Sequence, residues 1–311
     1  MITNTNTTRT IGKIGKYTLT EPLGESHLFP TYLAKKEGSS DSYVVKVMDT
    51  NDAAFSNECA VFGLPEHKNV IKLEESITDA IQLTSGSKTG TKHAIVMKYM
   101  ENGDLFNYLL QGPVSNEIAR YLFGQLLDAI EHLHSNDYCH LDIKLENILL
   151  DDDFSLKLTD FGFATKIDPS KPLTKSFGTP SCNPPEMWLI GFELKGYDGA
   201  KADIFQLGAL LYILIVGVPA FKEANSNDIW YKFILAEKWD AFWSNKEKAY
   251  RKKCITFDED FKDLISMLLC ADASMRPTIA EIRSSAWFKK IQPASTTEYI
   301  AEMQRRKALM K

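Results

Sequence analysis

Apolar and polar residues alternate in short runs over the first third of the chain, which indicates strands separated by turns. The runs are rich in β-branched and aromatic residues, as half-buried strands are. A Gly- and Ser-rich stretch at residues 85–90 predicts an exposed turn. The predicted strands cover residues 17–19, 31–34, 42–48, 70–73, 80–84 and 93–99.

One helix interrupts these strands. Asp52 can cap its first turn, and Phe55, Cys59 and Phe62 recur at a spacing that places them on one face. Glu58 lies beside that face, so its carboxylate is predicted to point inward; a solvated Glu on the helix surface is the alternative. This first part of the chain is therefore a sheet-dominated unit with one helix.

The hydrophobic period changes after residue 103, and most of the remaining chain is predicted to be helical. Residues 207–221 form an uncharged apolar run of 15 residues, too short to cross a bilayer and suited to a buried core helix. Residues 298–311 predict a basic terminal helix. The helical spacing of 3.6 residues is followed by Ala119, Leu122, Phe123, Leu126, Leu127, Ile130 and Leu133. The chain is therefore of the α+β class.

Composition narrows the class of protein. The chain has 311 residues with 44% apolar and 25% charged content, as an ordinary globular protein has. A net charge of −5 favours neither nucleic acid nor an anionic membrane as a partner. Five dispersed cysteines and a polar start without a secretory signal indicate reduced thiols and a cytoplasmic protein, with the nucleus as the alternative.

Two polar motifs carry the chemistry. His140-Leu141-Asp142-Ile143-Lys144-Leu145-Glu146-Asn147 is followed, thirteen residues after its Asn, by Asp160-Phe161-Gly162. They match H-R-D-x-x-x-x-N and D-F-G, except that Leu replaces Arg. The chain thus resembles the eukaryotic protein kinase family over residues 16–290. Its sequence also resembles the calcium/calmodulin-dependent kinase group at residues 211–221.

The resemblance implies a bilobal kinase fold. A polar N-terminal extension covers residues 1–15, a small β-rich lobe 16–98, a larger helical lobe 99–290, and a helical tail 291–311. The tail carries basic and apolar residues, so calmodulin binding or autoinhibition are hypotheses for it, beside the alternative of a solvated basic end.

The resemblance also implies roles for the motif residues. Asp142 would be the catalytic base for the substrate hydroxyl, and Lys144 would stabilise charge on the transferred phosphate. Asn147 and Asp160 are hard oxygen ligands for Mg²⁺, or for Mn²⁺ in its place. A polar surface loop with solvated charges is the alternative. Lys46 resembles the strand lysine that contacts the phosphates, with Glu58 as its ion-pair partner; a solvated strand Lys is the alternative.

ATP is the implied cofactor. Val44 replaces the usual Ala against the adenine ring, and Thr31 replaces the usual Val, while Met97 would gate the back of the pocket, although core packing also explains a Met there. The residues implied in nucleotide binding are Leu23, Gly24, Thr31, Val44, Lys46, Met97, Lys98, Tyr99, Met100, Asp104, Glu146 and Leu149.

The phosphate-covering loop departs most from the family. Of three expected glycines only Gly24 is present, with Ser26 and Phe29 in place of the others, followed by Pro30. Glycine lets backbone amides approach phosphates closely, and Pro has no amide proton. A raised KM for ATP is therefore expected.

Control of the activation segment also departs from the family. The Arg that binds a phosphorylated residue is Leu141 here, and Lys175 stands where the phosphate acceptor usually lies. Activity is therefore expected without phosphorylation of this segment. The family further implies an ion pair of Glu186 with Arg276, and Asp203 as the anchor of the catalytic loop. It also implies a hydrophobic column of Phe62, Leu73, His140 and Phe161.

Substrate preference rests on fewer residues. Phe163 after the D-F-G motif favours Ser over Thr as the acceptor. Asp104 and Glu146 favour basic residues upstream of it, although two surface acids are an equal alternative. The leading hypothesis is an ATP-dependent protein Ser/Thr kinase acting on a protein substrate. The rival is a pseudokinase scaffold with little or no phosphotransfer, because of the glycine-poor loop; a small-molecule kinase fits the peptide-site segment 178–186 poorly.

Overall fold

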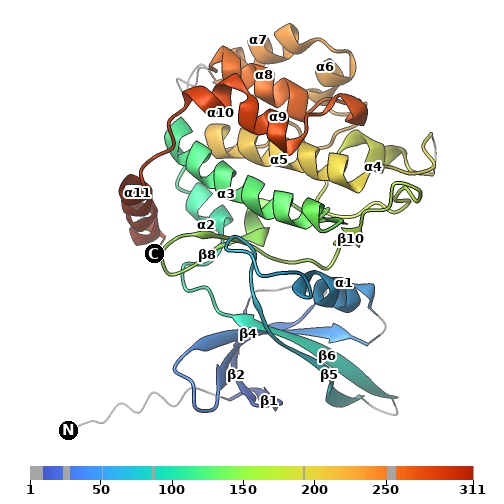
Figure 1. Cartoon of the computed structure of the whole chain (residues 1–311), viewed down its shortest axis with the longest axis vertical. Coiled ribbons are helices and arrows are strands. Elements are labelled where there is room, and N and C mark those ends of the chain that lie inside the picture. The colour runs from blue at the N-terminus through green and yellow to red at the C-terminus, as the bar shows by residue number, and fades with distance from the viewer. Residues whose placement is uncertain are drawn as a thin grey trace. The chain divides into compact units, whose positions relative to one another are not determined.

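The chain divides into two compact units in a computed structural model (Figure 1). The smaller unit holds residues up to 66 together with 71–101, and the larger holds 67–70 and 102 onward. The structure describes residues 10–23, 29–50, 52–85, 88–191, 193–250 and 257–310, with the backbone only for those among 81–90.

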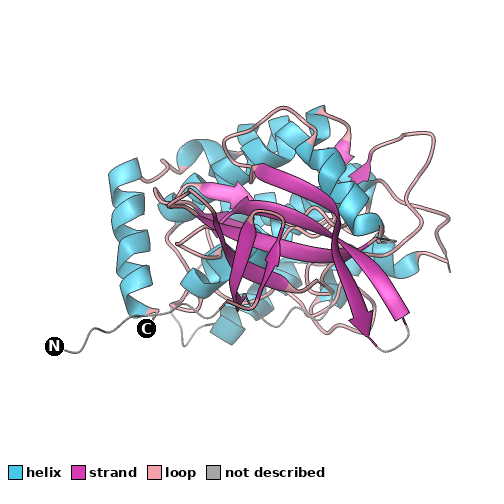
Figure 2. Ribbon diagram, turned by 90° about the horizontal axis from the view of Figure 1, so that it is seen from below, coloured by secondary structure: helices cyan, strands magenta, loops and turns pink. Residues whose placement is uncertain are grey.

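An antiparallel sheet dominates the smaller unit, in the order β1-β2-β3-β4-β6-β5. Figure 2 shows its strands in magenta. The helix α1 (Ala53–Phe62) begins at Asp52, whose side chain accepts a hydrogen bond from the Ala54 amide as predicted. The strands are β1 (Gly12–Ile14), β2 (Tyr17–Pro22), β3 (Thr31–Lys36), β4 (Ser42–Asp49), β5 (Leu73–Ser85) and β6 (Lys88–Lys98).

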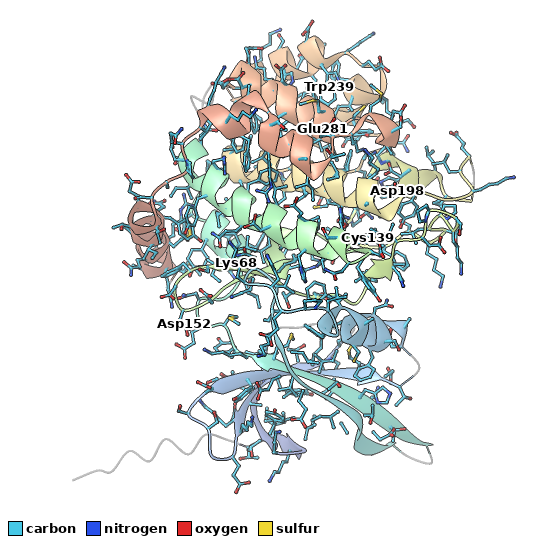
Figure 3. The ribbon with its side chains drawn as sticks, in the orientation of Figure 1. Lys68, Cys139, Asp152, Asp198, Trp239 and Glu281 are labelled. Atoms are coloured by element: carbon cyan, nitrogen blue, oxygen red, sulfur yellow. The ribbon has the colours of Figure 1, made fainter. Side chains whose placement is uncertain are left out.

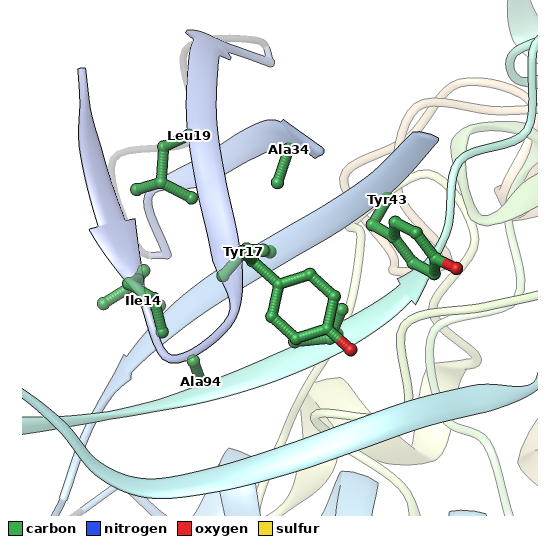
Figure 4. Packing of buried hydrophobic residues seen from close by; sticks show 9 residues of the cluster. Ile14, Tyr17, Leu19, Ala34, Tyr43 and Ala94 are labelled. Carbon is green, nitrogen blue, oxygen red and sulfur yellow. The ribbon is translucent and has the colours of Figure 1, made fainter. Parts of the chain in front are cut away.

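The core of this sheet lies on one of its faces. Tyr17 and Tyr43 meet edge to face there at 5.4 Å between ring centroids (Figure 4). The cluster consists of Ile14, Tyr17, Leu19, Ala34, Tyr43, Val45, Val47, Ala94 and Val96. Because strand side chains alternate, the residues between these positions face the other way.

Three local predictions for this unit need correction. Val70 is not part of a strand of the sheet: residues 67–70 belong to the larger unit, where Val70 bridges Leu158. The strand instead begins at Leu73 and continues to Ser85, and residues 88–90 of the predicted turn belong to β6. In α1 the buried face consists of Ala54, Phe55, Glu58 and Val61, whereas Cys59 and Phe62 are only half-buried.

The larger unit is mainly helical. Its long helices are α3 (Asn116–Ser135), α5 (Gly199–Val216), α7 (Trp239–Tyr250), α8 (Glu259–Leu268) and α11 (Thr296–Leu309). The shorter ones are α2 (Leu105–Leu109), α4 (Pro185–Leu189), α6 (Tyr231–Leu235), α9 (Ile279–Ser284) and α10 (Ala286–Lys290). Short antiparallel pairs are formed by β7 (Tyr138–Cys139) with β10 (Thr165–Lys166) and by β8 (Ile148–Leu150) with β9 (Leu156–Leu158).

The apolar periodicity predicted for α3 is confirmed, since every residue of that set is buried. The central helix α5 is long and apolar enough to cross a membrane by length and composition alone, but 78% of it is buried inside the protein. It ends at Gly217, whose φ of 78° is left-handed, so the apolar run continues past the helix into a loop. The tail helix α11 lies apart from the other long helices, beside α2 (Figures 1 and 2).

Candidate active site

In the smaller unit, Lys46 lies on a mainly apolar face of the sheet. The register pairs Lys46 with Thr31 and Ile95, and Val44 with Met97. Directly opposite residues of antiparallel strands share a face, as do residues two apart along a strand. Four predicted nucleotide-binding residues of β3, β4 and β6 therefore share the face opposite the tyrosine-rich core. Lys98, by contrast, pairs with a tyrosine of that core and lies on the same face as the core.

Lys46 forms the predicted ion pair with Glu58. Its Nζ lies 2.5 Å from Glu58 Oε1, and the two residues are 8% and 0% exposed. Both solvated alternatives are excluded by this burial. An isolated buried charge is costly, so the pairing of these two groups is what makes their burial tolerable.

Phe29 covers the same lysine. The Lys46 Nζ lies 5.0 Å from the centroid of the Phe29 ring, within the range of a cation–π interaction. The structure does not describe residues 24–28, which directly precede Phe29, and the predicted loop residues Gly24 and Ser26 are among them. Leu23 just before them is half-buried, and its amide donates to the Thr31 carbonyl.

The end of β6 carries the remaining nucleotide-binding candidates of this unit. Met97 and Met100 are buried, whereas Lys98 is exposed and Tyr99 half-buried. The Tyr99 amide donates to the Ser42 carbonyl at 2.9 Å, which extends the sheet one residue beyond β6. The burial of Met97 is compatible with its predicted position at the back of the nucleotide pocket and with core packing alike.

In the larger unit, Asp203 on α5 anchors the catalytic loop. Its carboxylate accepts hydrogen bonds from the amides of His140 and Leu141, both at 2.8 Å, and from His134 Nε2. Leu141 has a φ of 68°, a strained value for a branched residue that persists because these bonds fix it.

Gln206, three residues after Asp203 on the same helix face, completes this anchor. It accepts from the Ile143 amide and donates to the Leu141 carbonyl. The sequence analysis missed Gln206, although its i+3 spacing from Asp203 was a signal that could have pointed to it.

Asp142 is the centre of the loop's polar network. Its carboxylate accepts from Asn147 Nδ2 at 3.0 Å and from Thr179 Oγ1 at 3.0 Å, and it lies 2.8 Å from Lys144 Nζ. Burial alone would lower the pKa of Lys144, but the charge of Asp142 and the hydrogen bond to it outweigh burial and raise the pKa. Thr179, another residue whose role was missed, also accepts from Lys144.

The two predicted metal ligands suit Mg²⁺. The Asn147 amide nitrogen is held by Asp142, which leaves its oxygen to bind a cation. Asp160 has a left-handed φ of 64°, an unusual value that favours a functional constraint. No cluster of three His, Cys, Asp or Glu exists among the described residues, so the metal would depend on these two oxygens and on phosphates, as Mg²⁺ sites commonly do.

Three further nucleotide-binding candidates lie near the start of α2. Asp104 caps this helix: its Oδ1 accepts from the amide of Asn107, and both oxygens accept from the Asn107 side chain. Asp104 also pairs with half-buried Leu149 in a β-bridge, while Glu146 is exposed. Asp104 therefore has a structural task as well as its predicted role.

An apolar cluster holds the activation segment. Leu141 is fully buried among Cys139, Met187, Tyr197 and Ala202. Burial raises the pKa of the Cys139 thiol, which excludes it as a ready nucleophile. Cys139 and Asp198, which precedes α5, are labelled in Figure 3. The side chains that pack against the cluster are Phe163, Ile167, Leu173, Phe177 and Ile190.

Two further contacts fix the end of this segment. Gly178 has a φ of 78°, and a Cβ there would lie 2.6 Å from the Leu141 carbonyl oxygen, so only Gly fits against the catalytic loop. Glu186 and Arg276 form the predicted ion pair through two bonds of 2.6 and 2.7 Å.

The predicted hydrophobic column has two of its members in contact in the larger unit. The rings of His140 and Phe161 lie 5.3 Å apart between centroids.

These site residues lie within the range of the chain that matches a known family. Residues 17–288 match the family described as "Protein kinase domain". The chain belongs to the protein kinase family. The predicted bilobal kinase fold is thus confirmed: the kinase has a sheet-dominated unit and a larger helical unit.

Named relatives support this kinase assignment. CBL-interacting protein kinase 26 of Oryza sativa subsp. japonica is 29% identical over 286 residues, which cover 88% of this chain and 52% of that protein. CBL-interacting serine/threonine-protein kinase 20 of Arabidopsis thaliana is 31% identical, with 88% and 59% covered. The SNF-related serine/threonine-protein kinase of Homo sapiens is 30% identical, with 93% and 35% covered. The kinase thus spans about half the length, or less, of these relatives.

Proposed function

We propose that this protein is an ATP- and Mg²⁺-dependent protein serine/threonine kinase of the cytoplasm. The observation that carries the proposal is the network in which Lys144, Asn147 and Thr179 all contact the Asp142 carboxylate. Phosphoryl transfer asks an enzyme mainly to position groups and neutralise charge, and this network does both. Two relatives of similar sequence are named serine/threonine-protein kinases.

Each residue of the network has a defined task in this proposal. Asp142 orients the Ser hydroxyl and accepts its proton, while Lys144, whose raised pKa keeps it charged at neutral pH, neutralises the transferred phosphate. Asn147 and Asp160 would hold Mg²⁺, which would supply charge neutralisation for the phosphate oxygens. In the smaller unit, Lys46 would contact the α- and β-phosphates, and Glu58 holds it in place through their ion pair.

The decisive experiment is transfer of radiolabelled γ-phosphate to a basic Ser peptide. The wild type is expected to transfer label in Mg²⁺ or Mn²⁺, and Asp160→Ala to lose at least about a hundredfold because a metal ligand is removed. Asp168→Ala, which changes an exposed acid of the same segment, serves as a matched control. Equal transfer by the wild type and Asp160→Ala would favour the pseudokinase scaffold.

We also propose that the kinase needs no phosphate on its activation segment. The segment is held by packing on Leu141 and by paired backbone bonds of 2.9 Å between Leu173 and Tyr197. Tyr197 also donates its hydroxyl proton to the Lys175 carbonyl. These contacts take the place of the phosphate–Arg pair that orders such segments elsewhere.

Phosphatase-treated protein tests this second proposal. Protein shown by mass spectrometry to carry no phosphate is expected to keep its kcat, as is the double variant of the exposed acceptors, Thr174→Ala with Ser176→Ala. A loss of more than about tenfold in either sample, reversed by rephosphorylation, would show that the packing is not sufficient.

The peptide is proposed to carry Arg or Lys upstream of its Ser. Glu146 is exposed and Asp104 half-buried, so both acids are accessible to a cationic side chain. Phe163, which packs against Phe177 at 5.3 Å, supports Ser as the preferred acceptor. In a peptide array, Glu146→Gln is expected to weaken the basic preference; acidic upstream residues in the best peptides would contradict the proposal.

A further inference from the structure

The tail helix α11 lies beyond residues 17–288, the part that matches the kinase family, and it packs against α2. It begins with a capping box in which Ser295 and Glu298 satisfy each other's backbone amides. Tyr299, Met303 and Arg306 are buried, at the spacing of one helix face. Arg305 on the other face is exposed. The alternative of a solvated basic end is therefore correct for Arg305 and wrong for Arg306.

Arg306 is 3% exposed, and its guanidinium faces backbone carbonyls. Nη1 donates to the carbonyls of Tyr108 at 3.0 Å and Gly112 at 2.6 Å, and Nη2 donates to that of Pro113 at 2.7 Å. Nε donates to Glu302 on its own helix. A planar fork of five donors can satisfy several carbonyls at once, which a Lys ammonium cannot do with the same geometry.

The Tyr108 carbonyl lies in the last turn of the short helix α2, and the other two carbonyls lie in the segment that directly follows it. The carbonyl end of a helix carries partial negative charge, so a buried cation stabilises this end. Asp104 caps the other end of α2. Arg306 and Asp104 therefore hold the two ends of one short helix, and the helix presents Asp104 at its start.

Other α11 residues hold the segments next to α2. Lys307 donates to Asn102 Oδ1 at 2.5 Å, and Asn102 in turn donates to the Asp151 carbonyl. Tyr299 donates its hydroxyl proton to the Phe154 carbonyl in the turn between β8 and β9, and stacks on Tyr121 at 4.4 Å. This turn belongs to the hairpin that directly follows Asn147.

We propose that Arg306 is a positioning residue, which fixes α2 and residues 102–113 for nucleotide and peptide binding. This inference rests on the proposed kinase function, since Asp104 is its predicted contact to both ligands. The catalytic loop is anchored separately, by Asp203 and Gln206 of α5. Loss of Arg306 therefore weakens binding and leaves the chemical step intact.

The test compares Arg306→Met with Arg305→Met. Both variants lose one positive charge and one partner of Glu302. Arg306 differs in that it also donates to the three carbonyls at and after the end of α2. Without ligands, Arg306→Met is expected to raise hydrogen exchange of the amides of residues 108–112 and 114 at least tenfold, while Arg305→Met leaves it unchanged. In kinetics, Arg306→Met is expected to raise KM for peptide or ATP about fivefold with kcat within twofold. Arg306→Lys is expected to recover part of both effects because it keeps the charge.

Equal exchange in Arg306→Met and Arg305→Met would overturn the proposal, as would a kcat that falls while KM stays constant. Should Arg306→Met fail to fold, Arg306→Lys against Arg305→Lys gives the same comparison. Should the wild type transfer no phosphate, the kinase function fails but the exchange comparison still decides whether Arg306 fixes α2.

Discussion

At the scale of single residues, Phe29 is the most consequential departure from the kinase pattern. Its ring lies over the ammonium of Lys46, the group assigned to the ATP phosphates. A cation–π contact of this kind stabilises the pair by about 0.5–2 kcal/mol. Phosphates that approach Lys46 would have to displace the ring or share the cation with it, so Phe29 itself supplies a reason for a raised KM.

Phe29→Ala is therefore expected to lower the KM for ATP. Loss of about 1 kcal/mol of cation–π energy corresponds to about a fivefold lower KM, with kcat little changed. Initial rates over a range of ATP concentrations measure this effect. Ile229→Ala, at a 68% exposed position in the other unit, is the control. An unchanged or higher KM would show that Phe29 does not compete with the phosphates.

Leu141 is a second residue that departs from the kinase pattern, and the structure explains why an apolar residue stands there. It is fully buried in an apolar cluster, so the Arg of the family pattern cannot simply be restored. Leu141→Arg would bury a charge among apolar groups and is expected to lower the free energy of unfolding by about 3 kcal/mol or more. Urea denaturation measures this loss. Lys175→Thr, at an exposed position, should change it by less than about 0.5 kcal/mol. An undiminished unfolding free energy in Leu141→Arg would contradict the packing argument.

At the scale of elements, the helix α7 carries a lysine that is buried among aromatic rings. Lys246 is 1% exposed; its Nζ lies 3.9 Å from the Trp230 ring centroid and donates to the Ala220 carbonyl. Burial lowers the pKa of Lys246 to about 8, opposed by the charge of Asp228. Tyr212, a further ring around this ammonium, has its own pKa raised by burial.

The depressed pKa predicts a distinct dependence of stability on pH. Below pH 8 both folded and unfolded chains carry the Lys246 proton, and above it the folded chain loses the proton first. Between pH 7.5 and 9.5 this site should therefore raise the free energy of unfolding by about 1–2 kcal/mol. Denaturant titrations at both pH values measure it. Lys246→Met should abolish the rise, and Lys248→Met on the exposed side of α7 should not. Identical pH slopes in the two variants would refute the assignment.

Elements whose position is set by the local pattern of apolar residues could be predicted from the sequence. Elements whose position is set by contacts between distant residues could not. The strands and the α3 face followed from periodicity, because one burial direction dominates there. Val70 could not be predicted, since a backbone contact with Leu158 far along the chain decides its place. The α5 run ended early because Gly217 adopts a left-handed φ, for which a Gly alone is only a weak signal.

The same distinction holds within the candidate site. Asp142, Lys144 and Asn147 lie in one short motif, so the sequence brought them together without knowledge of the fold. Thr179 and Gln206 complete their network from positions more than thirty residues away, and only the fold reveals these contacts. Arg306 is more distant still: its basic character suggests solvent exposure, whereas the fold buries it against carbonyls at and after the end of α2.

At the scale of the whole molecule, charged groups assigned to catalysis belong to both units. Lys46 and Glu58 pair within the smaller unit, whereas the network around Asp142 is anchored by Asp203 within the larger one. Because each anchor lies within its own unit, we expect the two groups of residues to respond to mutation separately, even though phosphoryl transfer requires both.

Hydrogen exchange of Lys46→Met tests this independence. The variant takes the Lys46 ammonium from a fully buried carboxylate, so exchange in α1 is expected to rise by about tenfold or more, while amides 140–147 keep their protection. Phosphate transfer should fall by about a hundredfold or more in the same sample, since a phosphate contact is lost. Lys35→Met, which removes an exposed cation from the adjacent strand β3, should change neither measurement. Faster exchange at residues 140–147 in Lys46→Met would contradict this expectation and would mean that Lys46 and the catalytic loop are energetically coupled.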